Sequence, residues 1–247
     1  MMPVAQPRFN WLDEVYCLAS VEQQKNVRIR GKCMKHGLAI LTYVAADAPP
    51  NARRRLPEAV STLEQTAYPG RVVIADDGSE CSEHRAYLAT LARRYEVIER
   101  RENGGISRAK NSCLRALSET DIDVGFIAED DVEFRAGWWQ AYLEAHRKTG
   151  IHHFSWSRDH DPGGMVKRTR TINEHPIVNT SHVNGVLLTF TPKVIETVGG
   201  FRILPANWGH EHTNGTRRII AARLAPHFCD IVDSNRFLRL NRFSDSS

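Results

Sequence analysis

The chain has 247 residues, of which 41% are hydrophobic and 25% are charged, and its formal net charge is +4. This length suits one large domain, and the mildly basic balance fits a phosphate-bearing ligand as well as an ordinary soluble protein. Five scattered cysteines without a CxxC pair argue against a structural zinc site and indicate a reduced, cytoplasmic protein. No stretch has the character of a signal core or a transmembrane span, although peripheral membrane association stays open.

Strands and helices are predicted to alternate through the first two thirds of the chain. Apolar runs predict strands at 15–19, 38–45, 71–75, 95–99 and 126–128. Stretches with periodic apolar positions predict helices at 21–36, 54–66, 82–93, 107–117 and 138–146, with Ser107 as an N-cap. This order predicts an α/β fold with crossover units and a mostly parallel central sheet flanked by helices.

The sequence changes character after residue 151. The polar stretch 155–170 predicts a loop, 184–190 predicts a strand, and 192–198 predicts a short helix. A further loop leads into a helix that is predicted to run through residue 224. No linker of biased composition separates 151–247 from the preceding residues, so we expect both parts to belong to one domain.

Three acids, Glu129, Asp130 and Asp131, follow the predicted strand at 126–128. Two like charges about 4 Å apart repel by roughly 4 kcal/mol at an effective dielectric of about 20, so a positive group should lie beside them. Carboxylates at a strand end can hold a hard divalent cation, which can share the oxygens of a nucleotide diphosphate. A solvated acidic turn without a ligand would explain the same residues.

Two aspartates, Asp76 and Asp77, follow the predicted strand at 71–75 and precede Gly78 and Ser79. In an open parallel sheet, ligands gather at the carboxyl ends of the strands. An Asp at this point can accept hydrogen bonds from the base or the ribose of a nucleotide. The turn chemistry of an Asp-Gly pair is the plainer explanation of these residues taken alone.

A glycine loop at 103–105 precedes the predicted helix at 107–117, which carries Arg108 and Lys110. Backbone N–H groups at a helix start can bind phosphate, and the two basic residues add positive charge. The loop lacks the Gly-Lys-Ser/Thr ending of a phosphate-binding P-loop, and an ordinary glycine-rich loop would look the same.

Taken in order, these three stretches resemble the family 2 glycosyltransferases, which are enzymes of the GT-A fold. That family shows a strand ending in Asp-Asp-Gly-Ser, then an Asn-x-Gly-x-Ser-x-Ala-x-Asn stretch, then a strand ending in a DxD-like motif. The matching segments here are 76–79, 103–111 and 129–131, within a resemblance that covers about residues 38–143. It implies one Rossmann-like GT-A domain over 1–247. This domain would comprise an N-terminal extension at 1–37, a nucleotide-sugar half at 38–150 and an acceptor half at 151–247.

The resemblance also implies roles for individual residues. Asp131, in the last position of the DxD-like motif, would bind a divalent metal ion, Mn²⁺ or Mg²⁺. Glu129 takes the first position, where the family usually has Asp, so its contact to metal or ribose stays open. The residues expected to bind the donor nucleotide are Asp76, Asp77, Asn103, Gly105, Arg108, Lys110, Glu129 and Asp130.

The segment from Trp208 to His212 looks like the acceptor-side motif of galactosyltransferase-like GT-A enzymes. Many relatives carry an Asp after the Glu of this motif as the general base, and here His212 takes that place. The base that removes the acceptor proton is therefore Glu211 or His212, with Glu211 preferred, and Trp208 could stack on the acceptor. The two histidines, His210 and His212, lie on different faces of a helix, which disfavours a zinc site.

The resemblance therefore predicts a metal-dependent glycosyltransferase that moves a sugar from a nucleotide-diphosphate sugar to an acceptor hydroxyl, with inversion. A glycan is the default acceptor; a protein stays open, and so does a nucleic-acid base, which is not favoured. A nucleotidyltransferase would place a glycine-rich basic loop after its first strand, where 45–50 has none. A non-catalytic sugar- or nucleotide-binding module would not need both an acidic metal cluster and an acceptor-side acid.

Overall fold

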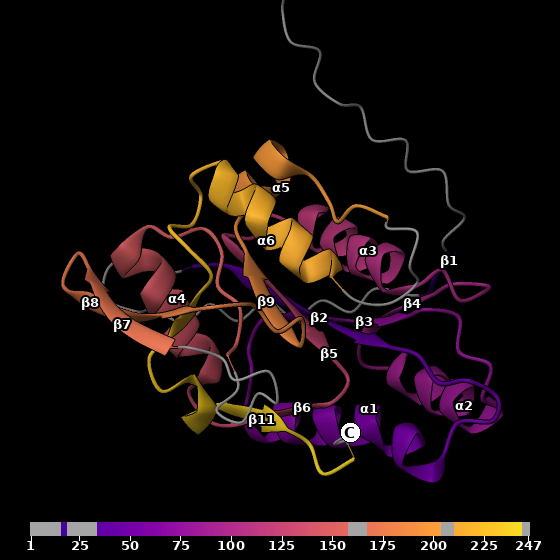
Figure 1. Ribbon diagram of the computed structural model, residues 1–247. Coiled ribbons are helices and arrows are strands. Elements are labelled where there is room, and N and C mark those ends of the chain that lie inside the picture. Colours follow the sequence, from indigo (N-terminus) through magenta and orange to yellow (C-terminus); the bar gives the residue numbers. More distant parts are fainter. Residues whose placement is uncertain (1–15, 19–33, 158–166, 204–209, 244–247) are drawn as a thin grey trace, which may run out of the picture.

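The computed structural model describes residues 16–18, 34–157, 167–203 and 210–243 (Figure 1). Trp208 and most of the predicted loop at 155–170 lie outside the described residues. The predicted helix at 21–36 also lies outside them except at its end, where His36 belongs to a strand.

A six-stranded sheet forms the centre of the fold. In spatial order its strands are β1 (Tyr16–Leu18), β4 (Glu96–Glu99), β3 (Arg71–Asp76), β2 (His36–Thr42), β5 (Val124–Glu129) and β9 (Leu187–Phe190). The four inner strands are parallel, whereas β1 and β9 pair in antiparallel orientation at the two edges. The predicted α/β fold with a mostly parallel central sheet is confirmed.

Helices cover both faces of this sheet. In Figure 1, α1 (Pro50–Gln65) and α2 (Ser82–Leu91) lie on one side. On the other side lie α3 (Ile106–Ser118), α5 (Pro192–Val198) and α6 (Glu211–Ala221). The chain crosses the sheet through α3 between β4 and β5, so the strand order reverses at β2. Open α/β sheets bind ligands outside the carboxyl ends of the strands at such a reversal.

The middle strand β2 is buried over all seven residues. A parallel strand covered by helices on both faces has no solvent-facing side, which explains its uninterrupted apolar run. The helix α4 (Trp138–Thr149) packs against two strands of the later part of the chain, β8 and β10. Within the described ranges, no helix combines the length and the apolarity that a membrane span requires.

Two small sheets contain strands that were not predicted. One holds β7 (Lys167–Ile172), β8 (His175–Thr180) and β10 (Cys229–Ile231), and the other pairs β6 (Val132–Phe134) with β11 (Leu238–Leu240), which follows the short 3-10 helix η1 (Ser234–Arg236). The predicted loop at 155–170 is therefore wrong at its end, where β7 begins. The β7 strand escaped prediction because it is a polar edge strand, exposed at four of its six residues.

The start of α3 also differs from the prediction. Gly105 rather than Ser107 occupies the N-cap position, with a φ of 83°, and Ser107 is buried in the first turn. Glycine adopts a positive φ without the steric cost that other residues bear. The glycine loop therefore turns sharply into the helix without a side-chain cap.

Candidate active site

The acidic strand ends meet at one edge of the sheet, as predicted. Thr42 ends β2 and pairs with Asp76 at the end of β3, while Glu129 at the end of β5 pairs with Leu41. Because the inner strands are parallel, their carboxyl ends form a common rim. This rim is where the sequence placed the donor site.

Asp76 and Asp77 hold the backbone of two loops at this rim. The Asp76 carboxylate accepts hydrogen bonds from the hydroxyl of Ser79 and from its backbone nitrogen, at 2.9 Å. Burial raises the pKa of Asp76, although the Ser79 bonds oppose this effect. Gly78, between Asp77 and Ser79, has a φ of 76°, and a Cβ there would lie 2.3 Å from the carbonyl carbon of Glu102. This turn therefore requires glycine.

Asp77 binds the glycine loop at 103–105 and connects it to the end of β3. Its carboxylate accepts hydrogen bonds from the backbone nitrogens of Gly104 at 3.2 Å and Gly105 at 2.9 Å, and it lies 3.1 Å from the guanidinium of Arg100. Burial raises the pKa of Asp77 to about 6 despite these contacts. Its position beside the loop is compatible with the predicted nucleotide contact, which stays a prediction.

The glycine loop itself is open to solvent. Asn103 and Arg108 are exposed and Gly105 is partly exposed. The side-chain oxygen of Asn103 accepts a hydrogen bond from the nitrogen of Gly105 at 2.9 Å. The N–H groups of Gly104 and Gly105 are already bonded to Asp77, so the feature that suits an anionic group such as a phosphate is the exposed Arg108 in the first turn of α3.

Protein cations lie beside Glu129 and Asp130 and reduce the repulsion between these neighbouring acids. Glu129 lies 2.9 Å from the ammonium of Lys110, and Asp130 lies 3.6 Å from the guanidinium of Arg55. Asp130 is only 6% exposed and accepts a 2.6 Å hydrogen bond from Thr42. Burial raises the pKa of Asp130 to about 6, although Arg55 and Thr42 oppose this effect. Its predicted contact with the donor is not favoured by this inward orientation.

The turn that carries these acids is held from behind by Asn241. Its side-chain nitrogen donates to the carbonyl oxygens of Arg55 at 3.1 Å and Asp130 at 3.2 Å. Its backbone nitrogen donates to the carbonyl oxygen of Asp131 at 2.7 Å. These bonds fix the backbone on which the partly exposed Asp131 is presented.

No group of three or more His, Cys, Asp or Glu side chains within the described ranges is arranged to hold a metal ion. The rim offers the partly exposed carboxylates of Asp131 and Glu129. Magnesium is commonly bound by one or two carboxylates and completes its shell with substrate phosphates and water. This donor set fits a cation that arrives with a diphosphate, and it does not fit an all-protein metal site.

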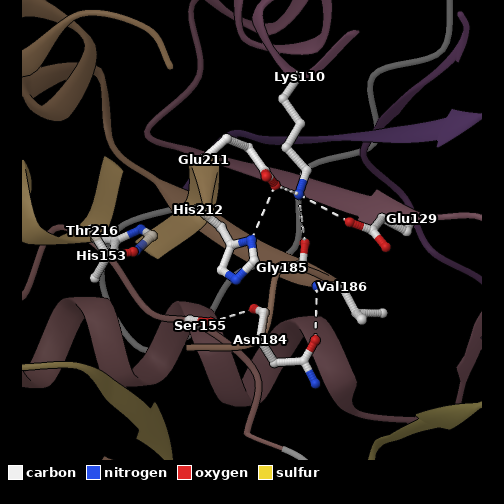
Figure 2. Close-up of polar contacts among 10 residues, drawn as sticks. All are labelled: Lys110, Glu129, His153, Ser155, Asn184, Gly185, Val186, Glu211, His212 and Thr216. Carbon is white, nitrogen blue, oxygen red and sulfur yellow. Dashed lines mark hydrogen bonds and ion pairs between the residues drawn. The ribbon is translucent and has the colours of Figure 1, made fainter. Parts of the chain in front are cut away.

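A buried cluster of charges joins the rim to the start of α6. Figure 2 shows the Lys110 side chain reaching from α3 toward Glu129, Glu211 and the carbonyl of Gly185. The ammonium lies 2.9 Å from Glu129, 2.8 Å from Glu211 and 3.1 Å from the Gly185 oxygen. The Lys110 side chain is fully buried, so its predicted contact with donor phosphate is not available in this arrangement.

Glu211 is held by two hydrogen-bond donors at once. The same oxygen that contacts Lys110 accepts a hydrogen bond from Nδ1 of His212 at 3.0 Å. Burial raises the pKa of Glu211, but the His212 bond and the Lys110 charge outweigh it and hold the pKa well below its usual range. Glu211 is only 2% exposed, whereas the His212 side chain is 20% exposed. The carboxylate that we preferred as the base is thus buried and weakly basic.

The backbone at Gly185 passes close to the His212 ring and to the Lys110 ammonium. A Cβ at this position would lie 2.8 Å from Nδ1 of His212 and 2.9 Å from Nζ of Lys110. Real Cβ atoms do not approach other atoms so closely, so a larger residue would displace one of these groups. Glycine at 185 therefore allows the loop before β9 to close over the cluster.

A buried histidine ties α6 to the sheet. His153 lies 2.7 Å from the carbonyl oxygen of Thr189 through Nδ1 and 2.9 Å from the hydroxyl of Thr216 through Nε2. A carbonyl can only accept, so Nδ1 carries the proton and Nε2 accepts from Thr216. Thr216 lies five residues after Glu211 on α6, so this contact helps fix the helix that carries Glu211 and His212 (Figure 2).

The roles of Lys110, Arg55 and Gly185 in this cluster and rim were not predicted from the sequence. One signal was present for Lys110, because it lies on the apolar stripe of its helix, at the spacing of Cys113, Leu114 and Leu117. A lysine on such a stripe must be paired when it is buried. The partners, which are up to 101 residues away, carry no corresponding signal.

An open, mostly parallel sheet with acidic strand ends and helices on both faces has the architecture of the GT-A fold. The model of glycosyl transferase family 2 matches residues 51–212, and the chain belongs to this family. It is 34% identical to an uncharacterized glycosyltransferase of Acanthamoeba polyphaga mimivirus over 217 residues, which are 87% of this chain and 84% of the relative.

Two solved structures share the fold at low sequence identity. A mannosyltransferase of Pyrobaculum calidifontis in complex with GDP-Man and Mn²⁺ has a TM-score of 0.52 and 18% identity, over 81% of this chain and 55% of that one. GalNAc-T7 with UDP, GalNAc and Mn²⁺ has a TM-score of 0.59 and 12% identity, over 75% of this chain and 40% of that one. This chain thus spans about half or less of the two solved chains.

Proposed function

We propose that this protein transfers a sugar from a nucleotide-diphosphate sugar to an acceptor hydroxyl, with inversion at the anomeric carbon and with the help of a divalent cation. One observation carries the proposal. The His212–Glu211 pair at the start of α6 is joined through Lys110 to Glu129 at the donor rim. A candidate proton acceptor and one acid of the donor rim, Glu129, thereby belong to a single cluster.

His212 is the better candidate for the general base. Its Nδ1 faces Glu211, so Nδ1 carries the proton and Nε2 is left with a lone pair. A carboxylate that orients an imidazole also stabilises the imidazolium that forms when the imidazole takes up a proton. Glu211 is therefore the orienting partner, which reverses our preference from the sequence. Figure 2 shows the second ring nitrogen of His212 directed away from Glu211.

The reaction would be a single displacement. The acceptor oxygen forms a bond to the anomeric carbon while the bond from that carbon to the diphosphate oxygen breaks. The proton of the acceptor hydroxyl passes to Nε2 of His212, and the diphosphate leaves with the bonding electrons. Attack opposite to the leaving group inverts the configuration of the sugar.

The donor would lie along the rim formed by the strand ends. Asp77 and the loop at 103–105 would contact the nucleotide and its phosphates, and the exposed Arg108 beside them supports this assignment. Asp131 would hold Mn²⁺ or Mg²⁺, which neutralises negative charge on the diphosphate. Two relatives in fold were solved with Mn²⁺ and with a nucleotide or nucleotide sugar, which supports this choice.

A transfer assay with a panel of donors tests this function. The purified protein is incubated with UDP-sugars and GDP-sugars, Mn²⁺ and oligosaccharide acceptors, and the products are analysed by mass spectrometry. We expect a free nucleoside diphosphate and an acceptor that has gained one sugar. Release of pyrophosphate would instead indicate a nucleotidyltransferase, and binding without turnover of any donor would indicate a binding module.

A further inference from the structure

The ammonium of Lys110 is buried, and its hydrogen bonds go to acceptors within the protein. Its side chain has no exposed surface, and it lies within hydrogen-bond distance of two carboxylates and one carbonyl oxygen. A lysine ammonium has three N–H donors, so all three are engaged. Contact with a bound phosphate would require one of these bonds to break inside a closed, buried cluster.

The partners of Lys110 come from three separate parts of the chain. Glu129 is the last residue of β5, Gly185 precedes β9, and Glu211 is the first residue of α6. Two of these partners are 75 and 101 residues away from Lys110 in the sequence. One ammonium therefore connects the donor rim with the helix that carries the acceptor-side residues.

We propose that Lys110 is a positioning residue, which holds the Glu211 carboxylate in place and thereby orients the His212 imidazole toward the acceptor. This role deepens the proposed transferase function and rests on it. It replaces the direct contact with donor phosphate that the sequence suggested for Lys110.

Electrostatics explain why a cation is needed at this point. Burial lowers the pKa of Lys110, but the charges of Glu129 and Glu211 outweigh it and raise the pKa above its usual value. The lysine thus stays charged. Without it, Glu211 would be a buried carboxylate whose remaining partner is His212, and burial would favour its protonation. A protonated Glu211 would be only a neutral acceptor for Nδ1–H, so it would hold the ring in this orientation more weakly.

Four variants test this role: Lys110→Met, Lys110→Arg, Glu211→Gln and the double variant Lys110→Met/Glu211→Gln. Lys110→Met keeps the length of the side chain and removes its charge. We expect it to bind UDP or GDP with Mn²⁺ as the wild type does, while kcat for transfer falls by about 10²-fold or more, the lower range for a lost general base. Lys110→Arg, which keeps the charge, should recover part of this loss.

The double variant shows whether Lys110 acts through Glu211 or whether the two residues contribute to transfer independently. If Lys110 acts through Glu211, the double variant should transfer no worse than the poorer single variant, since residues that act as a unit are not additive. It should also melt at a higher temperature than Lys110→Met, because no buried carboxylate that has lost its lysine remains at position 211. This second effect keeps the test usable if Lys110→Met alone does not fold.

Ring-nitrogen NMR of His212 provides a measurement that does not depend on activity. The wild type should show protonated Nδ1 and unprotonated Nε2, and Lys110→Met should show a mixture of tautomers. Loss of nucleoside diphosphate binding by more than about tenfold in Lys110→Met would instead place Lys110 on the donor. A double variant whose loss equals the product of the single losses, or an unchanged His212 tautomer, would also overturn the proposal. If the wild type transfers no sugar, the proposed function fails, while the NMR result still decides the role of Lys110.

Discussion

The carboxylate of Asp77 lies 2.9 Å from the backbone nitrogen of Gly105, 28 residues further along the chain. It thereby joins the end of β3 to the loop that opens α3. Asp77→Ala removes the acceptor of two backbone N–H groups, at Gly104 and Gly105. We expect a loss of about 1–3 kcal/mol in the free energy of unfolding. Binding of UDP or GDP should weaken as well.

Urea unfolding and calorimetry measure these two effects. Asp77→Asn, which keeps one acceptor oxygen, should lose less unfolding free energy and less affinity for UDP or GDP than Asp77→Ala. Glu80→Gln is the matched control, since Glu80 is an exposed acid of the same turn and should leave both quantities unchanged. If Asp77→Ala is as stable as the wild type and binds nucleotide equally well, Asp77 does not hold this loop.

Substitutions of His212 and Glu211 should separate the base from its orienting partner. His212→Gln removes the proton acceptor, and we expect kcat to fall by about 10²–10⁴-fold while donor affinity is kept. Glu211→Gln keeps a hydrogen-bond acceptor for Nδ1 and should cost less. Steady-state transfer kinetics give the comparison. An active His212→Gln beside an inactive Glu211→Gln would return the role of base to Glu211.

Donor binding should depend on a divalent cation through Asp131. Mn²⁺ should raise the affinity of the wild type for UDP or GDP, because the metal can bridge the diphosphate and the Asp131 carboxylate. In Asp131→Ala this gain should disappear, while affinity without metal stays as in the wild type. Calorimetric titration of both proteins with and without Mn²⁺ is the measurement. Equal affinities under all four conditions would rule out this metal site.

Gly185→Ala tests the closeness of the loop to the buried cluster. The added methyl group would collide with His212 or Lys110, so transfer should fall strongly while nucleotide binding persists. Gly150→Ala is the control. Its φ is 71°, so alanine there is strained, but nothing lies within 4 Å of the added carbon. That variant should lose stability without losing activity per folded molecule, and similar activity in the two variants would contradict the steric argument.

Protonation of His153 should destabilise the protein in mild acid. Burial lowers the pKa of His153 from 6.5 to about 4, so the folded state favours the neutral ring. The stability that this preference provides is present above the unfolded pKa of 6.5 and is lost as the pH falls toward 4. The residue accounts for roughly 2 kcal/mol of lost stability between about pH 7 and pH 5.

His153→Gln isolates this contribution, because glutamine stays neutral at both pH values. The variant should be less stable than the wild type at pH 7, yet its unfolding free energy should fall less on going to pH 5. Urea unfolding at the two pH values gives both numbers. Equal pH dependence in the two proteins would show that the ring is not held neutral.

The order of strands and helices was predictable from the sequence because each element of the parallel sheet is a local pattern. The run at Leu38–Leu41 is fully apolar since β2 has no solvent face, and the acids at 76–77 and 129–131 mark where β3 and β5 reach the rim. By contrast, β8 contains Pro176 and β7 is polar, so neither has the alternation typical of a strand. Their pairing is a tertiary effect.

The charge partners in the site could not be predicted in the same way. The sequence required a positive group beside the three acids, and this requirement was correct, but the groups are Arg55 and Lys110 rather than a metal alone. Nothing local distinguishes Arg55 from the neighbouring arginines of α1. The preference for Glu211 as the base likewise ignored its burial, which is set by residues far away in the chain.

The bonds from Asn241 to the turn at Asp130 and Asp131 affect the stage of synthesis at which this turn can take its final structure. A ribosome makes Asn241 111 residues after Asp130, whose carbonyl oxygen it binds. The parallel sheet can therefore assemble on a nascent chain long before this turn receives its last hydrogen bonds. A chain cut short before residue 241 would keep the strands that form the rim but would present Asp131 on an unanchored turn. Competence to hold the donor would thus be acquired late in synthesis, after the framework of the fold already exists.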